Sequence, residues 1–356
     1  MSLKLHGERI NKLVNWLAEV GEKPLVSKQV VNAIYRNNIN DFSKMHELSD
    51  ITRKRIIERF GDRFSTLESV TQKKGDSANK ALLRCSDGAK VEAVSLKFHN
   101  HHSLCISSQV GCAFGCTFCE SGKVGLKRQL SSSEITDQVY HFRQTEKIGS
   151  VSFMGMGEPL SNPKVFEAIS GLANPSQFGI PPARINVSTI GIIPGIKKLN
   201  SVHPNVNLAF SLHSPFPDQR AELMPIEKAY SFANVFDVLD ERIRLSRNRI
   251  WIAYLLLDGV NDSEDHARAL VNLIKGRDQD VRYLYHINLL PYNAGRTAQD
   301  HLKRTSDKSS FQLIIDNANI PSSYRNSFGR SIDAACGQLY AEYEARSVEP
   351  IIQHRS

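Results

Sequence analysis

The chain has 356 residues, of which 41% are hydrophobic and 23% charged, with 21 Gly and 14 Pro. This composition excludes collagen-like, low-complexity and disulfide-dense small proteins, and the length suits one large domain with a smaller one. The 45 Lys and Arg against 37 Asp and Glu give a formal net charge of +8, which favours a polyanionic partner. Basic side chains cluster at residues 53–63 and 242–249, where they either contact such a partner or form solvated helix faces.

The sequence shows no sign of a membrane segment. The longest apolar run, residues 250–257, is far shorter than the roughly 18 residues that a membrane span requires, and it suits a buried strand. The N-terminus lacks the basic, apolar and small-residue sections of a signal peptide. We therefore expect a cytoplasmic protein without membrane contact.

The first part of the chain predicts two small units. In residues 1–64, apolar side chains recur at helical spacing, as at Leu13, Trp16 and Leu17, and predict an accessory helical domain. Its basic cluster makes it the part expected to bind the polyanionic partner. Residues 65–104 then turn extended, with apolar runs on both sides of Ser86-Asp87-Gly88, and predict a β-hairpin.

From about residue 105 to residue 340, strand and helix patterns alternate. Strands are expected at 150–154, 186–189, 207–212, 250–256 and 284–289, and helices near 133–147, 163–173, 193–201, 229–246, 263–275 and 308–319. Repeated strand-then-helix units with buried strands imply a parallel sheet, and about six of them predict a partial or full barrel with its chemistry on the loops after the strands. Residues 341–356 form a polar tail.

The six cysteines suit metal ligation or thiol chemistry better than disulfides in a cytosolic chain. Cys112, Cys116 and Cys119 form a C-x3-C-x2-C triplet, which leaves a four-coordinate metal one ligand short. A structural zinc ion would need a fourth ligand, for which the candidates are Cys105, His101 and His102. The alternative is a 4Fe-4S cluster whose open iron binds a substrate or cofactor.

The triplet, with Phe118 before its last cysteine, resembles the signature of the radical S-adenosylmethionine superfamily. The resemblance implies that the triplet binds one 4Fe-4S cluster, that the open iron binds S-adenosylmethionine, and that the fold is a partial (β/α)6 TIM-like barrel. The segment Gly155-Met156-Gly157-Glu158 resembles the part that holds the amino group of the cofactor. Glycine permits a close backbone approach, and the carboxylate accepts hydrogen bonds.

Five segments, 153–159, 188–191, 211–215, 291–293 and 332–339, narrow the resemblance to the RlmN/Cfr family of radical S-adenosylmethionine ribosomal RNA adenine methyltransferases. The last segment, with its Asp-Ala-Ala-Cys-Gly-Gln sequence, is the most specific, and the resemblance covers nearly the whole chain. It implies that the cofactor pocket is lined by Gly157, Glu158, Ser188, Ser211, Leu212, His213 and Asn293.

The resemblance also implies catalytic roles for three residues outside the triplet. Cys336 would accept a methyl group from one S-adenosylmethionine. A radical derived from a second S-adenosylmethionine would then remove a hydrogen from that methyl group, and the methyl carbon would add to adenine. Cys105 would then attack the sulfur, releasing the product and forming a Cys105–Cys336 disulfide. Glu92 would remove the proton from the ring.

Within this family, the amino-acid sequence resembles the Cfr branch more closely than the RlmN branch in four segments, 152–154, 188–194, 211–215 and 252–254. The Cfr branch methylates carbon 8 of adenosine 2503 in 23S ribosomal RNA and confers resistance to antibiotics of the peptidyl-transferase centre. The alternative within the family is RlmN-type methylation of carbon 2 of the same adenosine, with transfer RNA as an additional substrate. Two further alternatives are a radical enzyme of another kind, such as a glycyl-radical activator, and a non-catalytic zinc-stabilised RNA-binding protein.

The family resemblance also sets the expected partners. These are protein-poor or unassembled 23S ribosomal RNA and an electron donor such as flavodoxin or ferredoxin, and we expect a monomer.

The sequence departs from the family at Glu120-Ser121, where a pair of small residues usually follows the triplet. An added carboxylate there would lower the reduction potential of the cluster.

Overall fold

A computed structural model describes residues 4–295, 302–306, 308–325, 329, 332, 334 and 337–339. Cys336 and the tail at 341–356 lie outside the described residues. In the described part, no helix is both long and apolar enough to cross a membrane.

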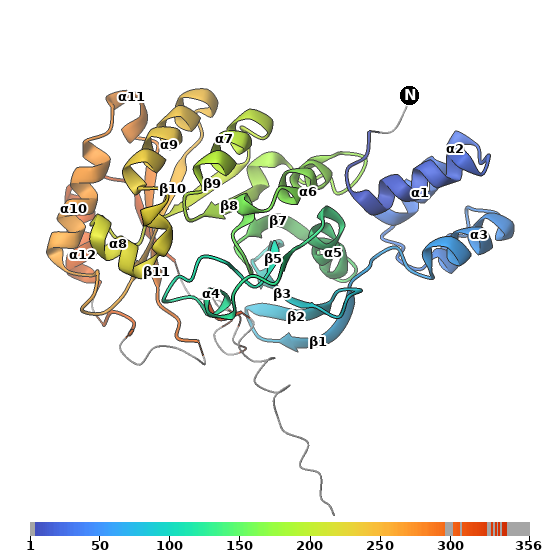
Figure 1. The fold of residues 1–356 in the computed structure, drawn as a ribbon, viewed down its shortest axis with the longest axis horizontal. Coiled ribbons are helices and arrows are strands. Elements are labelled where there is room, and N and C mark those ends of the chain that lie inside the picture. Colours follow the sequence, from blue (N-terminus) through green and yellow to red (C-terminus); the bar gives the residue numbers. More distant parts are fainter. Residues whose placement is uncertain are drawn as a thin grey trace, which may run out of the picture.

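The N-terminal part is helical, as the apolar spacing predicts, and it projects from one side of the molecule (Figure 1). Its elements are α1 (Glu8–Glu19), α2 (Pro24–Tyr35), the one-turn η1 (Phe42–Lys44) and α3 (Asp50–Phe60). Helix α1 buries Ile10, Leu13 and Leu17, which lie on one face. Ser49 is the N-cap of α3, and its side-chain oxygen accepts a hydrogen bond from the Thr52 amide.

This helical part is fixed to the barrel by polar contacts. The backbone amide of Gly7 donates to Glu167 Oε1 (3.0 Å), and that of Arg9 donates to Ser133 Oγ (3.2 Å). Arg36 donates to the carbonyl of Pro175 (2.8 Å). Since these contacts arise from the start of α1 and the end of α2, the N-terminal part has a defined position beside the barrel.

One ten-stranded sheet runs through the rest of the structure in the order β1-β2-β3-β4-β7-β8-β9-β10-β11-β12. Its strands are β1 (Glu68–Lys74), β2 (Ala78–Arg84), β3 (Lys90–Lys97), β4 (His102–Cys105), β7 (Ile148–Phe153), β8 (Ile185–Thr189), β9 (Asn207–Ser211), β10 (Ile250–Leu256), β11 (Tyr285–Pro291) and β12 (Ser322–Tyr324). Strands β1 to β4 pair antiparallel, and all pairs from β4 to β12 are parallel. The predicted hairpin, β2 and β3, is thus part of a three-stranded extension of the barrel sheet.

The parallel strands and their helices form the predicted partial barrel, with the helices on the outside (Figure 1). The main helices are α5 (Ser132–Arg143), α6 (Lys164–Ala173), α7 (Ile193–Val202), α9 (Phe232–Ser246), α10 (Glu264–Lys275) and α12 (Ser309–Asn317). Shorter elements are α4 (Glu120–Val124), α8 (Pro217–Leu223), α11 (Gln279–Arg282), η2 (Pro159–Ser161), η3 (Pro182–Arg184), η4 (Pro225–Lys228) and the strand pair β5 (Gln109–Val110) and β6 (Arg128–Gln129). Strand β12 adds a seventh parallel strand that the sequence pattern did not predict.

The two basic clusters differ in their surroundings. Arg242 is buried and donates to Asn200 Oδ1 (2.8 Å) and to the carbonyl of Pro204 (3.1 Å), while Arg244 pairs with Asp278 and Asp280. Arg242 is therefore not part of a solvated face, whereas Arg244 is exposed and paired with two carboxylates.

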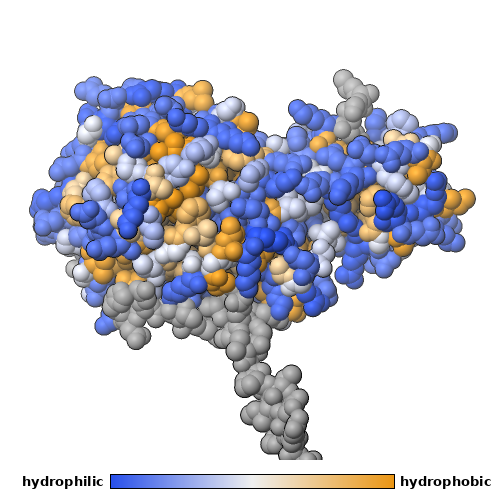
Figure 2. Space-filling view, viewed as in Figure 1, coloured by the Kyte–Doolittle hydropathy of each residue, from blue (hydrophilic) through white to orange (hydrophobic). Residues whose placement is uncertain are grey.

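In the N-terminal cluster, Arg53 donates to the carbonyl of Leu48 (2.8 Å), whereas Lys54 and Arg59 are exposed. Hydrophilic residues cover most of this part of the molecule in the view of Figure 2. In α3, Lys54 and Arg59 are therefore exposed to a polyanion, Arg55 is partly exposed, and Arg53 is engaged with the backbone.

Candidate active site

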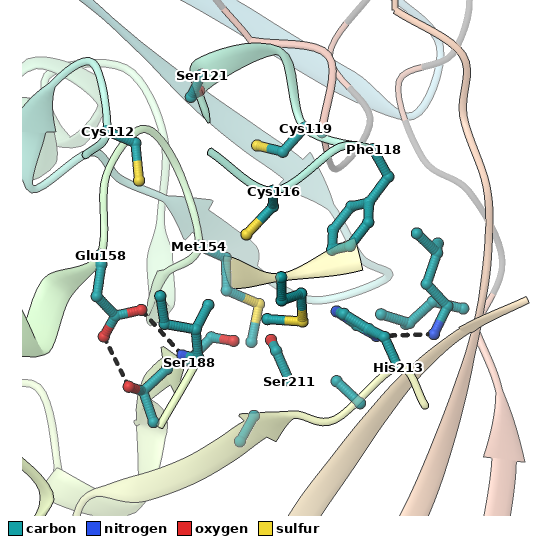
Figure 3. Close-up of a pocket in the computed structure, with 18 of the residues that line it drawn as sticks. Cys112, Cys116, Phe118, Cys119, Ser121, Met154, Glu158, Ser188, Ser211 and His213 are labelled. Atoms are coloured by element: carbon teal, nitrogen blue, oxygen red, sulfur yellow. Dashed lines mark hydrogen bonds between the residues drawn. The ribbon is translucent and has the colours of Figure 1, made fainter. Parts of the chain in front are cut away.

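A cavity of about 190 Å³ lies at the carboxyl ends of the parallel strands. Nine of the thirteen predicted site residues line it, which brings together residues from the cysteine loop and from the ends of four parallel strands or the loops that follow them (Figure 3). These nine are Cys112, Cys116, Cys119, Gly157, Glu158, Ser188, Ser211, His213 and Asn293. The carboxyl ends of the strands are where barrel enzymes place their chemistry.

The cysteine loop runs from β5 to α4 and is closed by backbone hydrogen bonds. The Cys112 amide donates to the carbonyl of Gly125 (3.2 Å), and the Cys119 amide donates to the carbonyl of Cys116 (3.1 Å). Gly111 has a φ of 78°, and a Cβ atom there would lie 1.8 Å from the Gly125 oxygen, so only glycine fits. The close approach of these two glycines holds the loop around its three thiols.

The chemistry of the loop fits an iron–sulfur cluster. Figure 3 shows the three sulfur atoms pointing toward a common space, and Phe114, Phe118 and Met224 provide an apolar surround. Burial raises the pKa of Cys112 to about 11 and raises the pKa values of Cys116 and Cys119, so the free thiols are protonated and a metal must displace their protons.

The three thiols do not form a site for a single metal ion in the described part of the structure. In the described part of the chain, no three His, Cys, Asp or Glu side chains stand close enough to hold one ion. The thiolates of a cubane cluster bind different irons and lie further apart than the ligands of a single ion, so this spacing is compatible with a cluster.

Glu158 follows β7 and is an almost fully buried carboxylate. It accepts hydrogen bonds from Thr189 Oγ1 (2.7 Å), the Ile190 amide (3.0 Å) and the Leu160 amide (3.1 Å). Desolvation raises its pKa to about 7 despite these three donors. Glu158 is therefore a fixed acceptor, and a cationic ammonium group in the cavity would stabilise its ionised form.

Gly157 permits the backbone to approach Gln109. Its φ is 94°, and a Cβ atom would lie 2.5 Å from the Gln109 side chain. Gln109 Oε1 accepts a hydrogen bond from the Glu158 amide (2.8 Å). The glycine thus fixes the backbone that carries the buried carboxylate, as the predicted cofactor-binding segment requires.

His213, which follows β9, is a neutral imidazole of fixed orientation. Its Nδ1 accepts a hydrogen bond from the Leu255 amide (3.0 Å), so the proton is on Nε2. Burial lowers its pKa to about 3, and its ring lies edge-on to Phe118 with 4.9 Å between centroids. The φ of 58° at His213 places the ring in the cavity, where Nε2 is a hydrogen-bond donor.

Leu212 differs from its neighbours because its side chain is packed in the core rather than on the cavity wall. Its carbonyl accepts a hydrogen bond from Arg220 Nε (3.0 Å). Any contact of Leu212 with a cofactor would therefore be made through the backbone.

Cys105 and Glu92 lie on strands β4 and β3 and are not among the residues that line the cavity. Cys105, the last residue of β4, is directly opposite Val94 on β3, and Val94 is opposite Lys80 on β2. Glu92 is two residues from Val94, so these side chains share one face of the sheet. On the other side, Cys105 pairs with Ser152, which lines the interior of the barrel. Cys336 lies outside the described residues, and with it the predicted Cys105–Cys336 disulfide.

Glu120, the unusual residue after the triplet, is buried and pairs with Lys123 (Oε1 to Nζ 3.3 Å). It contributes to the raised pKa of Cys119. Ser121 lines the cavity. The added negative charge thus lies near the third thiol and has a lysine beside it.

Two residues that line the cavity, Thr189 and Arg325, were not singled out from the sequence. Thr189 orients Glu158, and its place beside a predicted cofactor-binding serine was an available signal. Arg325 brings a positive charge to the cavity wall. It follows β12, a three-residue strand without an apolar run, so no pattern pointed to it.

Comparisons with known proteins agree with this geometry. Residues 106–271 match the family model of the radical SAM superfamily, and residues 3–60 match that of the ribosomal RNA large subunit methyltransferase N-terminal domain. The ribosomal RNA large subunit methyltransferase Cfr of Shouchella clausii is 42% identical over 350 residues, covering 97% of this chain and 99% of the relative. The chain belongs to the RlmN/Cfr family.

Within the RlmN/Cfr family, the chain falls in the Cfr branch. The Cfr methyltransferase of Staphylococcus aureus is 41% identical over 340 residues, covering 94% of this chain and 97% of the relative. A radical SAM methyltransferase from Sphaerobacter thermophilus has a similar crystal structure, with a TM-score of 0.86 and 31% identity over 95% of this chain and 99% of that chain. The chain is thus a radical SAM methyltransferase, and membership of this superfamily implies a 4Fe-4S cluster and S-adenosylmethionine.

Proposed function

We propose that this protein methylates carbon 8 of adenosine 2503 in 23S ribosomal RNA and thereby confers resistance to antibiotics of the peptidyl-transferase centre. One observation carries the proposal: nine predicted site residues surround a single cavity in a chain that is 42% identical to a Cfr methyltransferase over 97% of its length. The comparison supports the branch, and the cavity supports the chemistry.

In this proposal, Cys112, Cys116 and Cys119 hold the cluster, and the loop after β7 receives the amino group of S-adenosylmethionine. When bound, the two groups supply a one-electron cleavage that generates a hydrogen-abstracting radical. Glu158 accepts from the ammonium group, and His213 donates through Nε2. Two molecules of S-adenosylmethionine are consumed per turnover, one as methyl donor and one as radical source.

The remaining steps belong to three side chains. Carbon 8 is an electrophilic amidine carbon, so it does not attack a methyl donor directly, and the sulfur of Cys336 carries the methyl group first. After the carbon of that group has bonded to the ring, the adduct must lose one electron and one proton to restore the ring: the bound cluster would accept the electron, and Glu92 would remove the proton. The Cys105 thiolate then attacks the Cys336 sulfur, and the carbon–sulfur bond breaks with its electron pair moving to the carbon. The carbon takes up a proton to become the methyl group, and a Cys105–Cys336 disulfide forms.

The proposal also names the electron donor, the form of the RNA substrate and the oligomeric state of the enzyme. An external donor such as flavodoxin or ferredoxin supplies the electron, the substrate is protein-poor 23S ribosomal RNA, and the enzyme acts as a cytoplasmic monomer. Reduction of the Cys105–Cys336 disulfide after each turnover also requires an external thiol or reductant.

The decisive experiment follows the isotope label. Reconstituted enzyme is supplied with an RNA fragment deuterated at carbon 8 or at carbon 2 of the target adenosine, and the product is mapped by mass spectrometry. Loss of the carbon 8 label alone supports the proposal, and loss of the carbon 2 label would assign RlmN-type activity instead. Expression in a susceptible bacterium should reduce its sensitivity to phenicols and oxazolidinones, with Cys336→Ala as the inactive control.

A further inference from the structure

Arg325 brings a positive charge to the cavity. Its backbone amide donates to the carbonyl of Leu289 (2.9 Å), which continues the pairing of β12 with β11. Among the described residues that line the cavity, Arg325 alone is a lysine or arginine. It also lines a second cavity of about 380 Å³ inside the barrel, together with Ser152, Asn186 and Asn288. The residue therefore stands at the boundary between the two cavities.

The guanidinium of Arg325 reaches across the barrel interior to the β7 side. Its Nη1 lies 3.7 Å from the sulfur of Met154, which directly follows β7. A thioether is a weak acceptor and carries no charge. Within the described part of the chain, no carboxylate pairs with this half-buried cation.

Two other arginines that are buried or half-buried have carboxylate partners. Arg220 is paired with Glu227 and donates to the carbonyl of Leu212, and Arg277 is held by Asp237 and Asp240. The guanidinium of Arg325 brings its charge to the cavity wall without such a partner among the described residues. The contrast indicates a place where an anion completes the site.

We propose that Arg325 binds an oxyanion of a bound substrate, either the carboxylate of S-adenosylmethionine or a phosphate of the RNA. The fork of N–H groups on a guanidinium suits both anions, because each offers two oxygens in a plane. The amino-acid end of S-adenosylmethionine carries one ammonium and one carboxylate, and the cavity offers Glu158 and Arg325, which favours the carboxylate. The inference rests on the proposed function, since it assumes these substrates.

The first arm of the test measures cofactor binding without RNA. In reconstituted holoenzyme, Arg325→Gln should weaken the binding of S-adenosylmethionine by about tenfold or more in equilibrium dialysis, because it removes a charge-assisted pair of hydrogen bonds to the carboxylate. Arg325→Lys keeps the charge without the fork, and its affinity should fall between those of wild type and Arg325→Gln. Arg268→Gln is the matched control, because Arg268 is exposed on α10 and pairs with Glu264 outside the cavity.

The second arm measures RNA binding over a range of salt concentrations. If the anion is a phosphate, Arg325→Gln should leave cofactor binding unchanged, weaken binding of a 23S RNA fragment and lower the salt slope by about 0.7–0.9. Iron content and unfolding temperature are measured for each variant, and Arg325→Met replaces the Gln variant if the latter loses iron.

The outcomes separate this inference from the proposed function. If the wild-type protein binds both substrates and Arg325→Gln binds both within twofold of wild type, the role of Arg325 is overturned while the proposed function stands. If wild-type protein takes up no cluster and binds no S-adenosylmethionine, the proposed function itself fails.

Discussion

Lys80 Nζ lies 3.2 Å from Glu92 Oε1, and each side chain is only 5% exposed. The two residues come from neighbouring antiparallel strands, and the register places them on the same sheet face as Cys105. A buried carboxylate without a cation nearby is costly, so the lysine stabilises the ionised Glu92 that the proposed proton removal requires.

We expect Lys80→Met to lower the free energy of unfolding by about 3 kcal/mol, because it leaves a buried carboxylate without this cation. The double variant Lys80→Met/Glu92→Leu should recover most of that loss, and denaturant titration of all three proteins measures it. Lys80→Met with wild-type stability would show that the Lys80–Glu92 pair contributes nothing to the free energy of unfolding.

Glu92→Gln should bind cluster and cofactor normally and lose turnover.

Alanine at Cys112, Cys116 or Cys119 should abolish cluster binding, because each thiol occupies a different position around one space. The readout is iron content and visible absorption after anaerobic reconstitution. Cys85→Ala is the matched control, since Cys85 is a buried cysteine away from the cavity. A Cys116→Ala variant that retained iron and full activity would contradict the ligand assignment.

Cys105→Ala should accumulate a covalent protein–RNA adduct. Without the attacking thiol, the carbon–sulfur bond to Cys336 stays intact, whereas Cys336→Ala should form no adduct at all. Denaturing electrophoresis with labelled RNA distinguishes the two variants. Normal turnover by Cys105→Ala would assign the release step to another group.

Glu158 gives the protein without cluster and cofactor a defined pH dependence. Its folded-state pKa of about 7 lies above the ordinary value of 4.5, so between these pH values the folded chain holds a proton that the unfolded chain releases. The free energy of unfolding should therefore fall as pH rises from about 4.5 to about 7, by up to about 3 kcal/mol from this group.

Glu158→Gln removes the titrating group and should flatten that part of the profile, whatever its effect on absolute stability. The three thiols do not interfere, because burial raises their pKa values and keeps them protonated in this range. Parallel profiles of wild type and variant would contradict the raised pKa.

The exposed basic residues of α3 should contribute to RNA affinity. Replacing Lys54 and Arg59 by Gln should weaken RNA binding, and the salt slope should fall by about 0.7–0.9 for each phosphate that the variant no longer neutralises. Arg53→Gln should instead lower stability, because Arg53 holds the carbonyl of Leu48. An unchanged slope in the double variant would leave these side chains as a solvated face.

Five of the parallel strands could be predicted from buried apolar runs, which are local signals, and the family resemblance predicted nine of the residues that line the cavity. Strand β10, for example, covers the predicted residues 250–256. The short polar strand β12 carries no such signal, and so Arg325 was missed. The burial of Arg242 was equally invisible, because its partners are carbonyls more than 30 residues away in the chain. Contacts of this kind depend on packing rather than on local pattern.

The pairing of β3 with β4 joins the extension and the barrel in one continuous hydrogen-bonded sheet. A shortened protein that starts at residue 100 would lose β1 to β3 and leave β4 as an open sheet edge, a form that invites edge-to-edge aggregation. It would also lose Glu92 while keeping every cysteine of the triplet. If such a fragment were insoluble, the result would not show whether methylation requires Glu92. That question requires point substitutions of Glu92 in the full chain.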